Sequence, residues 1–413
     1  MSRSGARTSS MVAVLAFLTA TQPFASAQSA TASAEKEAPK AVEAAGYVFV
    51  SGQGGRRTDG SLPEKFRDQA RQTLENVGSV LQASGLTKDH VVYVQVYLED
   101  IKQIHELDEA FADYFPKDPP ARAVLGVAKL LNSPIQMNAV AVRDLDGKRV
   151  VSLAGLKPNK GFSAGMLTRD QLFVSAMDGR DPATGVVPKD PALQVNQALD
   201  GVKSVVQAAG LTMAHMVFVN PYMTNEISYR AMNEEYAKRF EFGNTPGRAT
   251  IEVSSLPNGA HIAYTGIAVK DLSRRLAVRP KNMPPSPTAS PCVFAGDLLY
   301  CSAKSGFIPG PNGGVYFPST ADQTRQTMRN LLDNLEEAGM AFDEVVSTTI
   351  YLDDLRDAGS FDKVYSRYFP KGLPAQTVVQ QLAAGDRKAD EEGHYPTLEQ
   401  VSLVAVRSKA TSK

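Results

Sequence analysis

The residues Tyr47-Val48-Phe49-Val50-Ser51-Gly52-Gln53 begin a pattern that the chain presents three times. Two similar stretches follow, Leu172-Phe173-Val174-Ser175-Ala176 and Leu299-Tyr300-Cys301-Ser302-Ala303, so that the three serines are 124 and 127 residues apart. After each stretch, the residue pattern predicts a Gly-rich loop, an amphipathic helix, an alternating strand, a second helix and a closing pair of apolar strands. A period of this length is that of a whole domain, and we expect three copies of one small domain.

The first copy shows the predicted elements best. Its first helix carries one apolar face, formed by Phe66, Ala70, Leu74, Val77 and Leu81. A hairpin followed by helix, strand, helix and strands predicts an α+β sandwich with its helices on one face of a sheet. A domain of roughly 110 residues is small enough that the other sheet face needs a partner to cover it. We place the repeats at residues 45–145, 160–271 and 288–408.

The N-terminal segment has the composition of a secretory signal peptide. Arg3 and Arg7 precede the apolar stretch from Met11 to Ala20, and Ala25-Ser26-Ala27 offers a cleavage site. We therefore expect residues 1–27 to be removed, residues 28–44 to form a flexible N-terminus, and the protein to be secreted or periplasmic. An uncleaved N-terminal anchor is the alternative. After signal removal we expect no membrane association.

The charge balance argues against a nucleic-acid partner. The chain has 44 Lys and Arg and 44 Asp and Glu residues, and the loss of Arg3 and Arg7 leaves a net charge of −2. No cluster of Lys and Arg stands out, whereas phosphate binding needs clustered positive charge. Residues with metal-ligand spacing are also missing, so we expect neither a metal nor another cofactor.

Cys292 and Cys301, the two cysteines of the chain, flank the predicted tight turn at Gly296-Asp297. With a two-residue turn they face each other on a pair where antiparallel strands come closest, and an exported protein permits a cross-strand disulfide. Two separate small apolar side chains are the alternative.

Several short motifs, repeated in the same order, resemble one known family. They are the Val50-Ser51-Gly52-Gln53 strand end, the Asp181-Pro182-Ala183-Thr184-Gly185 loop, the Ala209-Gly210-Leu211 helix end, the Tyr351-Leu352-Asp353-Asp354 strand end, and the Pro120-Ala121-Arg122 and Pro246-Gly247-Arg248 segments. Each repeat is similar to the Rid family of reactive intermediate deaminases, also known as YjgF or endoribonuclease L-PSP proteins. The resemblance implies chorismate-mutase-like α/β sandwich domains and a trimer with clefts between neighbours. Three copies in one chain would form this trimer as an intramolecular pseudo-trimer.

The resemblance also implies a chemistry, the hydrolysis of imines and enamines to keto acids and ammonium. Such a site needs a cation for the substrate carboxylate, and arginine can pair with a carboxylate through two hydrogen bonds. Arg122 and Arg248 stand at the family's arginine position, and Gln376 replaces the arginine in the third repeat. Pairing with an acid across a domain interface is the alternative role of both arginines.

The family's acidic residue, which positions or activates water, has no equivalent at the aligned positions Gln136, Ala263 and Gln400. Glu399 is one residue away, which on a strand points to the opposite face unless a bulge intervenes. We take Gln136 and the hydroxyl of Ser51 as the catalytic candidates. The serines could instead only cap strand ends.

The remaining substrate-binding candidates also follow from the resemblance. They are Gly52, Ser175, Phe162, which keeps an aromatic ring of the family, and Asn233 on the second helix. Asp108 and Asp362 replace Asn233 in the other repeats, and an acid there would repel a carboxylate ligand unless it is paired.

Two functions stay open. The chain is an exported Rid-like hydrolase of small imines or enamines, or a binding protein for a small carboxylate or aromatic ligand that does not turn it over. The missing acids favour the second function and the retained arginines favour the first. Ribonuclease activity is not expected, because the neutral charge balance gives no basic, aromatic-rich surface for RNA.

Overall fold

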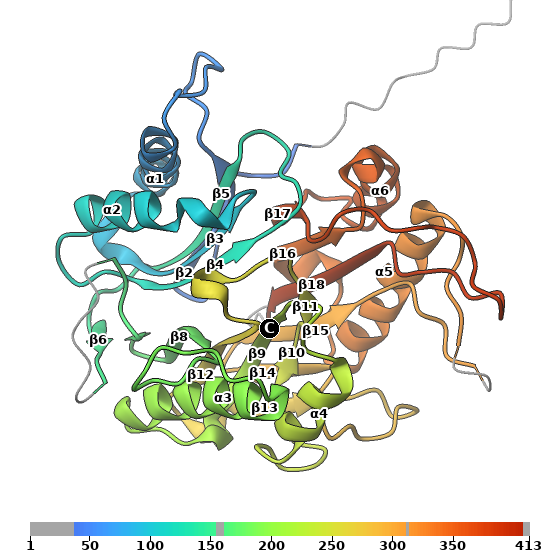
Figure 1. Ribbon diagram of the computed structural model, residues 1–413. Coiled ribbons are helices and arrows are strands. Elements are labelled where there is room, and N and C mark those ends of the chain that lie inside the picture. Colours follow the sequence, from blue (N-terminus) through green and yellow to red (C-terminus); the bar gives the residue numbers. More distant parts are fainter. Residues whose placement is uncertain (1–36, 154–160, 311–313, 408–413) are drawn as a thin grey trace, which may run out of the picture. The chain divides into compact units, whose positions relative to one another are not determined.

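The computed structural model describes residues 37–153, 161–310 and 314–407, which lie within one compact unit. The expected signal peptide, residues 1–27, lies outside the described residues. Figure 1 shows three helix pairs with a β-sheet beside each pair.

The first repeat forms a five-stranded sheet in the order β1-β2-β5-β3-β4. Its strands are β1 (Ala41–Ala44), β2 (Tyr47–Gly54), β3 (Val91–Leu98), β4 (Ala121–Gly126) and β5 (Ile135–Val142). Helices α1 (Phe66–Ala83) and α2 (Ile104–Tyr114) follow β2 and β3. The predicted apolar face of the first helix is buried, with Ala70 and Leu81 fully inaccessible. The pair β3 and β4 is parallel because α2 connects their ends.

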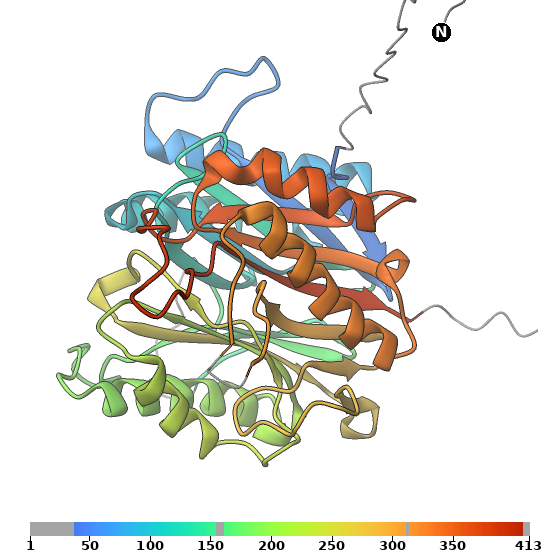
Figure 2. The same ribbon diagram turned by 90° about the vertical axis from the view of Figure 1, so that its right-hand side faces the viewer.

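The other two repeats have the same order of elements with additional edge strands. The second sheet contains β6 (Arg149–Val151), β7 (Gly165–Leu167), β8 (Gln171–Asp178), β9 (Met216–Met223), β10 (Gly247–Arg248), β11 (Ile251–Glu252) and β12 (Ile262–Val269), with helices α3 (Pro191–Ala208) and α4 (Tyr229–Ala237). The third sheet contains β13 (Arg275–Val278), β14 (Cys292–Ala295), β15 (Leu298–Lys304), β16 (Val345–Leu352), β17 (Ala375–Gln380) and β18 (Glu399–Val406), with helices α5 (Thr320–Glu337) and α6 (Ala358–Tyr365). Figure 2 shows α5 and α6, in orange tones, side by side on one side of this sheet.

The sheets begin earlier in the sequence than the expected repeat boundaries. Residues 41–44, expected within a flexible segment, form β1 and pair with Tyr47–Val50. Ala45 and Gly46 both have positive φ, 49° and 80°, which is the geometry of a tight hairpin turn of type I′. Strands β6 and β13 likewise precede the expected starts of the second and third repeats.

Four apolar clusters explain how the sheets are covered. Three clusters each belong to one repeat and fill the space between its helices and its sheet. The fourth cluster contains residues of all three sheets, among them Tyr97, Tyr222 and Tyr351. The face that a single small domain would leave exposed is therefore buried against the other two repeats. This confirms the predicted intramolecular pseudo-trimer of α/β sandwich domains.

Cys292 and Cys301 form a disulfide between β14 and β15, where they are directly opposite each other. In the described part of the chain, no helix has the length and apolar character needed to span a bilayer.

Candidate functional site

An equivalent hydrogen bond, from a backbone N–H to a serine hydroxyl, recurs at each of the three contacts between successive repeats. The backbone N–H of Arg122 donates to Ser175 Oγ over 2.8 Å, and that of Arg248 donates to Ser302 Oγ over 2.8 Å. The N–H of Gln376 donates to Ser51 Oγ over 2.9 Å, which closes the ring. Each arginine-position residue therefore meets the serine of the next repeat. We call the three contact regions cleft 1/2, cleft 2/3 and cleft 3/1.

The serine hydroxyls are already engaged in these contacts. Ser175 Oγ donates to the carbonyl of Ser163 over 2.6 Å, and Ser302 Oγ donates to the carbonyl of Ser290 over 2.6 Å. Ser51 Oγ donates to the carbonyl of Pro39 over 2.5 Å. Each hydroxyl donates to a carbonyl of its own repeat and accepts from an N–H of the preceding repeat, so these side chains join neighbouring repeats.

The ring arrangement separates two predicted site residues. Gln136 belongs to the same repeat as Arg122 but lies beside Gly52, in cleft 3/1. A Cβ atom at Gly52 would lie 2.8 Å from Gln136 Cδ, so this position accepts only glycine without a shift of the glutamine. Since Gln376 replaces the arginine here, cleft 3/1 has no guanidinium for a carboxylate ligand.

In cleft 1/2, the arginine forms an ion pair with a carboxylate of the same chain. Arg122 is 4% exposed, and its Nη2 donates to Asp108 Oδ1 over 2.5 Å. Its guanidinium carbon lies 4.6 Å from the ring centroid of Phe111 and 4.8 Å from that of Phe162. Burial lowers the pKa of Arg122, and the charge of Asp108 acts in the opposite direction. Asp108 thus supplies the negative charge that a ligand carboxylate would bring and engages Nη2, while the buried Nη1 has no hydrogen-bond partner among the described residues.

In cleft 2/3, the corresponding arginine meets a neutral partner. Arg248 Nη1 donates to Asn233 Oδ1 over 2.7 Å, and its guanidinium carbon lies 5.1 Å from the ring centroid of Tyr236. Ala289 lines this cleft at the position where cleft 1/2 has the ring of Phe162. The smaller side chain leaves a cavity of about 330 Å³ open beside Arg248.

The lining of this cavity fits an anionic ligand. Its lining residues are Tyr229, Arg248, Thr250, Met283, Ser286, Ala289, Ser290, Pro291, Ser302, Ala303, Lys304 and Gln400, and none of them is acidic. Burial lowers the pKa of Arg248, and the hydroxyls of three neighbouring tyrosines, Tyr236, Tyr264 and Tyr229, act in the opposite direction. Thr250 is 9% exposed and its hydroxyl has no hydrogen-bond partner among the described residues. A buried cation and a buried unpaired hydroxyl both become more stable when a ligand supplies a negative charge and an acceptor.

Glu399 does not lie in this cleft. It pairs with Leu352 in regular register, one residue before Gln400, and points toward helix α5, where Thr327 donates to it. The alternation of the strand therefore places Gln400 in the cavity and Glu399 on the helix side, without the bulge that would have reversed them. Burial raises the pKa of Glu399 to about 8.

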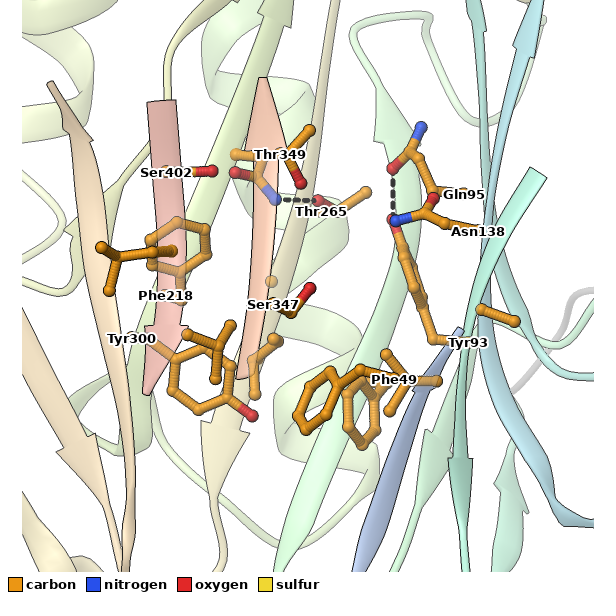
Figure 3. A pocket seen from close by; sticks show the side chains of 18 of the residues that line it. Phe49, Tyr93, Gln95, Asn138, Phe218, Thr265, Tyr300, Ser347, Thr349 and Ser402 are labelled. Carbon is orange, nitrogen blue, oxygen red and sulfur yellow. Dashed lines mark hydrogen bonds between the residues drawn. The ribbon is translucent and has the colours of Figure 1, made fainter. Parts of the chain in front are cut away.

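A second cavity, of about 120 Å³, lies between the three sheets. Figure 3 shows Thr265, Thr349, Ser402, Gln95 and Asn138 toward one end, with Phe49 and Tyr300 toward the other. Tyr93 donates to Gln95 Oε1 over 2.7 Å within it. None of its lining residues is charged, so a carboxylate would find no cation there. We therefore assign the candidate site to cleft 2/3.

Asn233→Asp is expected to close this site, because it supplies the carboxylate that Asp108 supplies in cleft 1/2. The affinity for a 2-oxo acid should fall by about tenfold or more, since the ligand loses a charge-assisted hydrogen bond to Arg248. Isothermal titration calorimetry measures this change, and Asn233→Ala serves as the matched control. An affinity unchanged by the aspartate would show that Arg248 does not bind the ligand.

The fold and the site define a single-chain pseudo-trimer with chemically unequal clefts between its repeats. The sequence profile of the family described as Endoribonuclease L-PSP matches residues 28–143, 153–270 and 282–389, which is most of the chain. The chain belongs to this family and contains three tandem Rid-like repeats.

Three relatives each cover 25–29% of the chain, about the length of one repeat. A RutC family protein of Aquifex aeolicus is 41% identical over 109 residues, which cover 25% of this chain and 86% of that protein. The chloroplastic Reactive Intermediate Deaminase A of Arabidopsis thaliana is 35% identical over 135 residues, covering 29% of this chain and 72% of that protein. The crystal structure of RidA from the Antarctic bacterium Psychrobacter sp. is 30% identical, covers 25% of this chain and 85% of its own, and has a TM-score of 0.24.

The structure also shows site residues that the sequence pattern did not reveal. Lys304 and Thr250 line cleft 2/3. A register shift between Cys301 and Lys304 interrupts the pairing of β15 with β18, so strand alternation alone could not place Lys304 in the cleft. No group of three or more metal-ligating side chains occurs within residues 37–153, 161–310 and 314–407.

Proposed function

We propose that cleft 2/3 binds a small carboxylate-bearing imine or enamine and that the chain hydrolyses it to a 2-oxo acid and ammonium. The observation that carries this proposal is the open cavity beside Arg248, a guanidinium that lacks an acidic partner among the described residues. The deaminase name of the Arabidopsis thaliana relative supports the reaction class.

In this proposal, Arg248 orients the substrate by donating two parallel hydrogen bonds to its carboxylate. The imine carbon then faces Gln400, whose amide oxygen can accept a hydrogen bond from an attacking water. Water adds to the carbon, a proton moves to the nitrogen, and the C–N bond breaks to release ammonium and the carbonyl compound. Imines hydrolyse readily in water, so positioning and charge neutralisation can be sufficient for catalysis.

The test supplies an enamine, formed in situ from an amino acid, and measures release of the 2-oxo acid. The rate of 2-oxo acid release should be higher with wild-type protein than in buffer alone. It should also be higher than with the Asn233→Asp variant, in which the cleft carries its own carboxylate. Gln400→Leu should retain 2-oxo acid binding but lose rate. Release at the buffer rate by wild-type protein would contradict the hydrolase proposal.

A binding protein without turnover is the second candidate function. The observation that favours it is the absence of an acidic residue from the lining of cleft 2/3. A 2-oxo acid that binds to wild-type protein, combined with no rate above buffer, would support this function instead.

We propose further that the protein is exported and works in a secreted or periplasmic location. The basic and apolar segments within residues 1–27 support this, and the Cys292–Cys301 disulfide fits an oxidising compartment. The mass of the protein purified from its native cells should correspond to a chain that begins after Ala27.

A further inference from the structure

Cleft 2/3 contains a second cation. Lys304, the last residue of β15, lines the same cavity as Arg248 and is partly buried. The other two repeats have neutral residues here, Gln53 and Met177, each two positions after the serine that joins neighbouring repeats. The amide of Gln53 donates to the carbonyl of Ser51 over 2.9 Å. Lys304, in contrast, adds a second positively charged residue to the lining of its cleft.

Lys304 lacks an acidic partner among the described residues. Burial lowers its pKa, and no charged group acts on it noticeably. Glu399, on the neighbouring strand, accepts a hydrogen bond from Thr327 of helix α5, and neither its pKa nor the pKa of Lys304 reflects a charge interaction between the two groups. Burial of an ammonium group without a counter-charge costs free energy, which a bound anion recovers.

We propose that cleft 2/3 selects a dianionic ligand, with one carboxylate on Arg248 and a second anionic group on Lys304. This inference rests on the proposed binding of a carboxylate at Arg248 and adds the substrate class. It points to 2-oxo dicarboxylates and to imines formed from acidic amino acids. Lys304 and Arg248 belong to different repeats, so a dianionic ligand has to be long enough to contact both repeats.

Two cations in one cleft favour a ligand with two anionic groups over a ligand with one. A single guanidinium binds any 2-oxo acid and leaves Lys304 buried and unpaired. A ligand that reaches both cations removes both desolvation penalties, while one with a methyl group at its far end removes only the penalty at Arg248. The unpaired hydroxyl of Thr250 lies in the same lining and can donate a hydrogen bond to the carbonyl or imine between the two charged ends.

The test compares 2-oxoglutarate with 2-oxopentanoate, which has the same carbon chain with a methyl group in place of the second carboxylate. Calorimetry should show about tenfold or greater preference of the wild-type protein for 2-oxoglutarate, the magnitude of one charge-assisted hydrogen bond. Lys304→Met should abolish this preference and leave the affinity for 2-oxopentanoate nearly unchanged. Lys304→Arg should retain a preference, and Met177→Lys, which adds a lysine to cleft 1/2, should not increase it.

Equal affinity of the wild-type protein for the two ligands would overturn the proposal, as would a preference that survives Lys304→Met. In both cases, binding of 2-oxopentanoate that depends on Arg248 would leave the proposed function intact. If neither ligand binds, the carboxylate site itself is wrong, and the dianion proposal is rejected together with the proposed function.

Discussion

Arg248→Met is expected to weaken 2-oxo acid binding by about 100-fold, because the ligand loses two charge-assisted hydrogen bonds. Methionine fills a similar volume and can pack its thioether against the ring of Tyr236, in place of the guanidinium that lies over this ring in the wild type. The variant should fold normally, since Arg248 pairs with the neutral Asn233 and its removal leaves no charge behind. Calorimetry with 2-oxopentanoate measures the loss.

Arg122→Met is the matched control for this experiment. It removes the equivalent arginine from cleft 1/2, where Asp108 already occupies the guanidinium. Ligand affinity should stay within a factor of about two of wild type. A loss of binding in Arg122→Met of the same size as in Arg248→Met would assign ligand binding to both clefts and contradict the account.

Glu399→Gln is expected to stabilise the protein strongly at alkaline pH. Burial raises the pKa of Glu399 to about 8 from its ordinary 4.5, so the folded protein keeps a proton that the unfolded chain releases. The stability of the wild type therefore falls as pH rises from about 4.5 to 8, and the full penalty remains above pH 8. The penalty is on the order of 5 kcal/mol, because each pKa unit between the two states corresponds to about 1.4 kcal/mol.

Denaturant unfolding at several pH values tests this expectation. The Glu399→Gln variant should be more stable than wild type at pH 9, and the two should converge near pH 4, where Glu399 is protonated in both states. Glutamine keeps an oxygen for the hydrogen bond from Thr327. The same substitution at the exposed Glu336, on helix α5, is the control and should leave the pH dependence unchanged. A difference between wild type and Glu399→Gln that does not vary with pH would show that the pKa of Glu399 is the same in the folded and unfolded protein.

The fold could be predicted from the sequence because its signals are local and occur three times. Helix faces such as Phe66 to Leu81 and the serine-bearing strands fix the elements of each repeat. The uncovered sheet face of a small domain then leads to the pseudo-trimer. Strand β1 was missed because four residues rich in alanine carry little strand signal, and only the turn at Ala45-Gly46 brings them into the sheet.

The site could be predicted only in part, because it depends on which repeat meets which. Sequence comparison identified Arg122, Arg248 and Gln376 as equivalent, but it did not show that each faces the serine of the next repeat. The different roles of the two arginines depend on whether residue 108 or 233 is charged and whether residue 162 or 289 is aromatic. These are contacts between distant segments, and no local pattern specifies them.

The central claim is that the three clefts are unequal and that cleft 2/3 is the one that binds the ligand. A crystal structure of the protein soaked with 2-oxopentanoate tests it most directly. The account predicts one ligand per chain, with its carboxylate on Arg248, while Arg122 remains paired with Asp108 and no ligand lies beside Gln376. A ligand bound to Arg122 with Asp108 displaced, or equal occupancy of all three clefts, would contradict it.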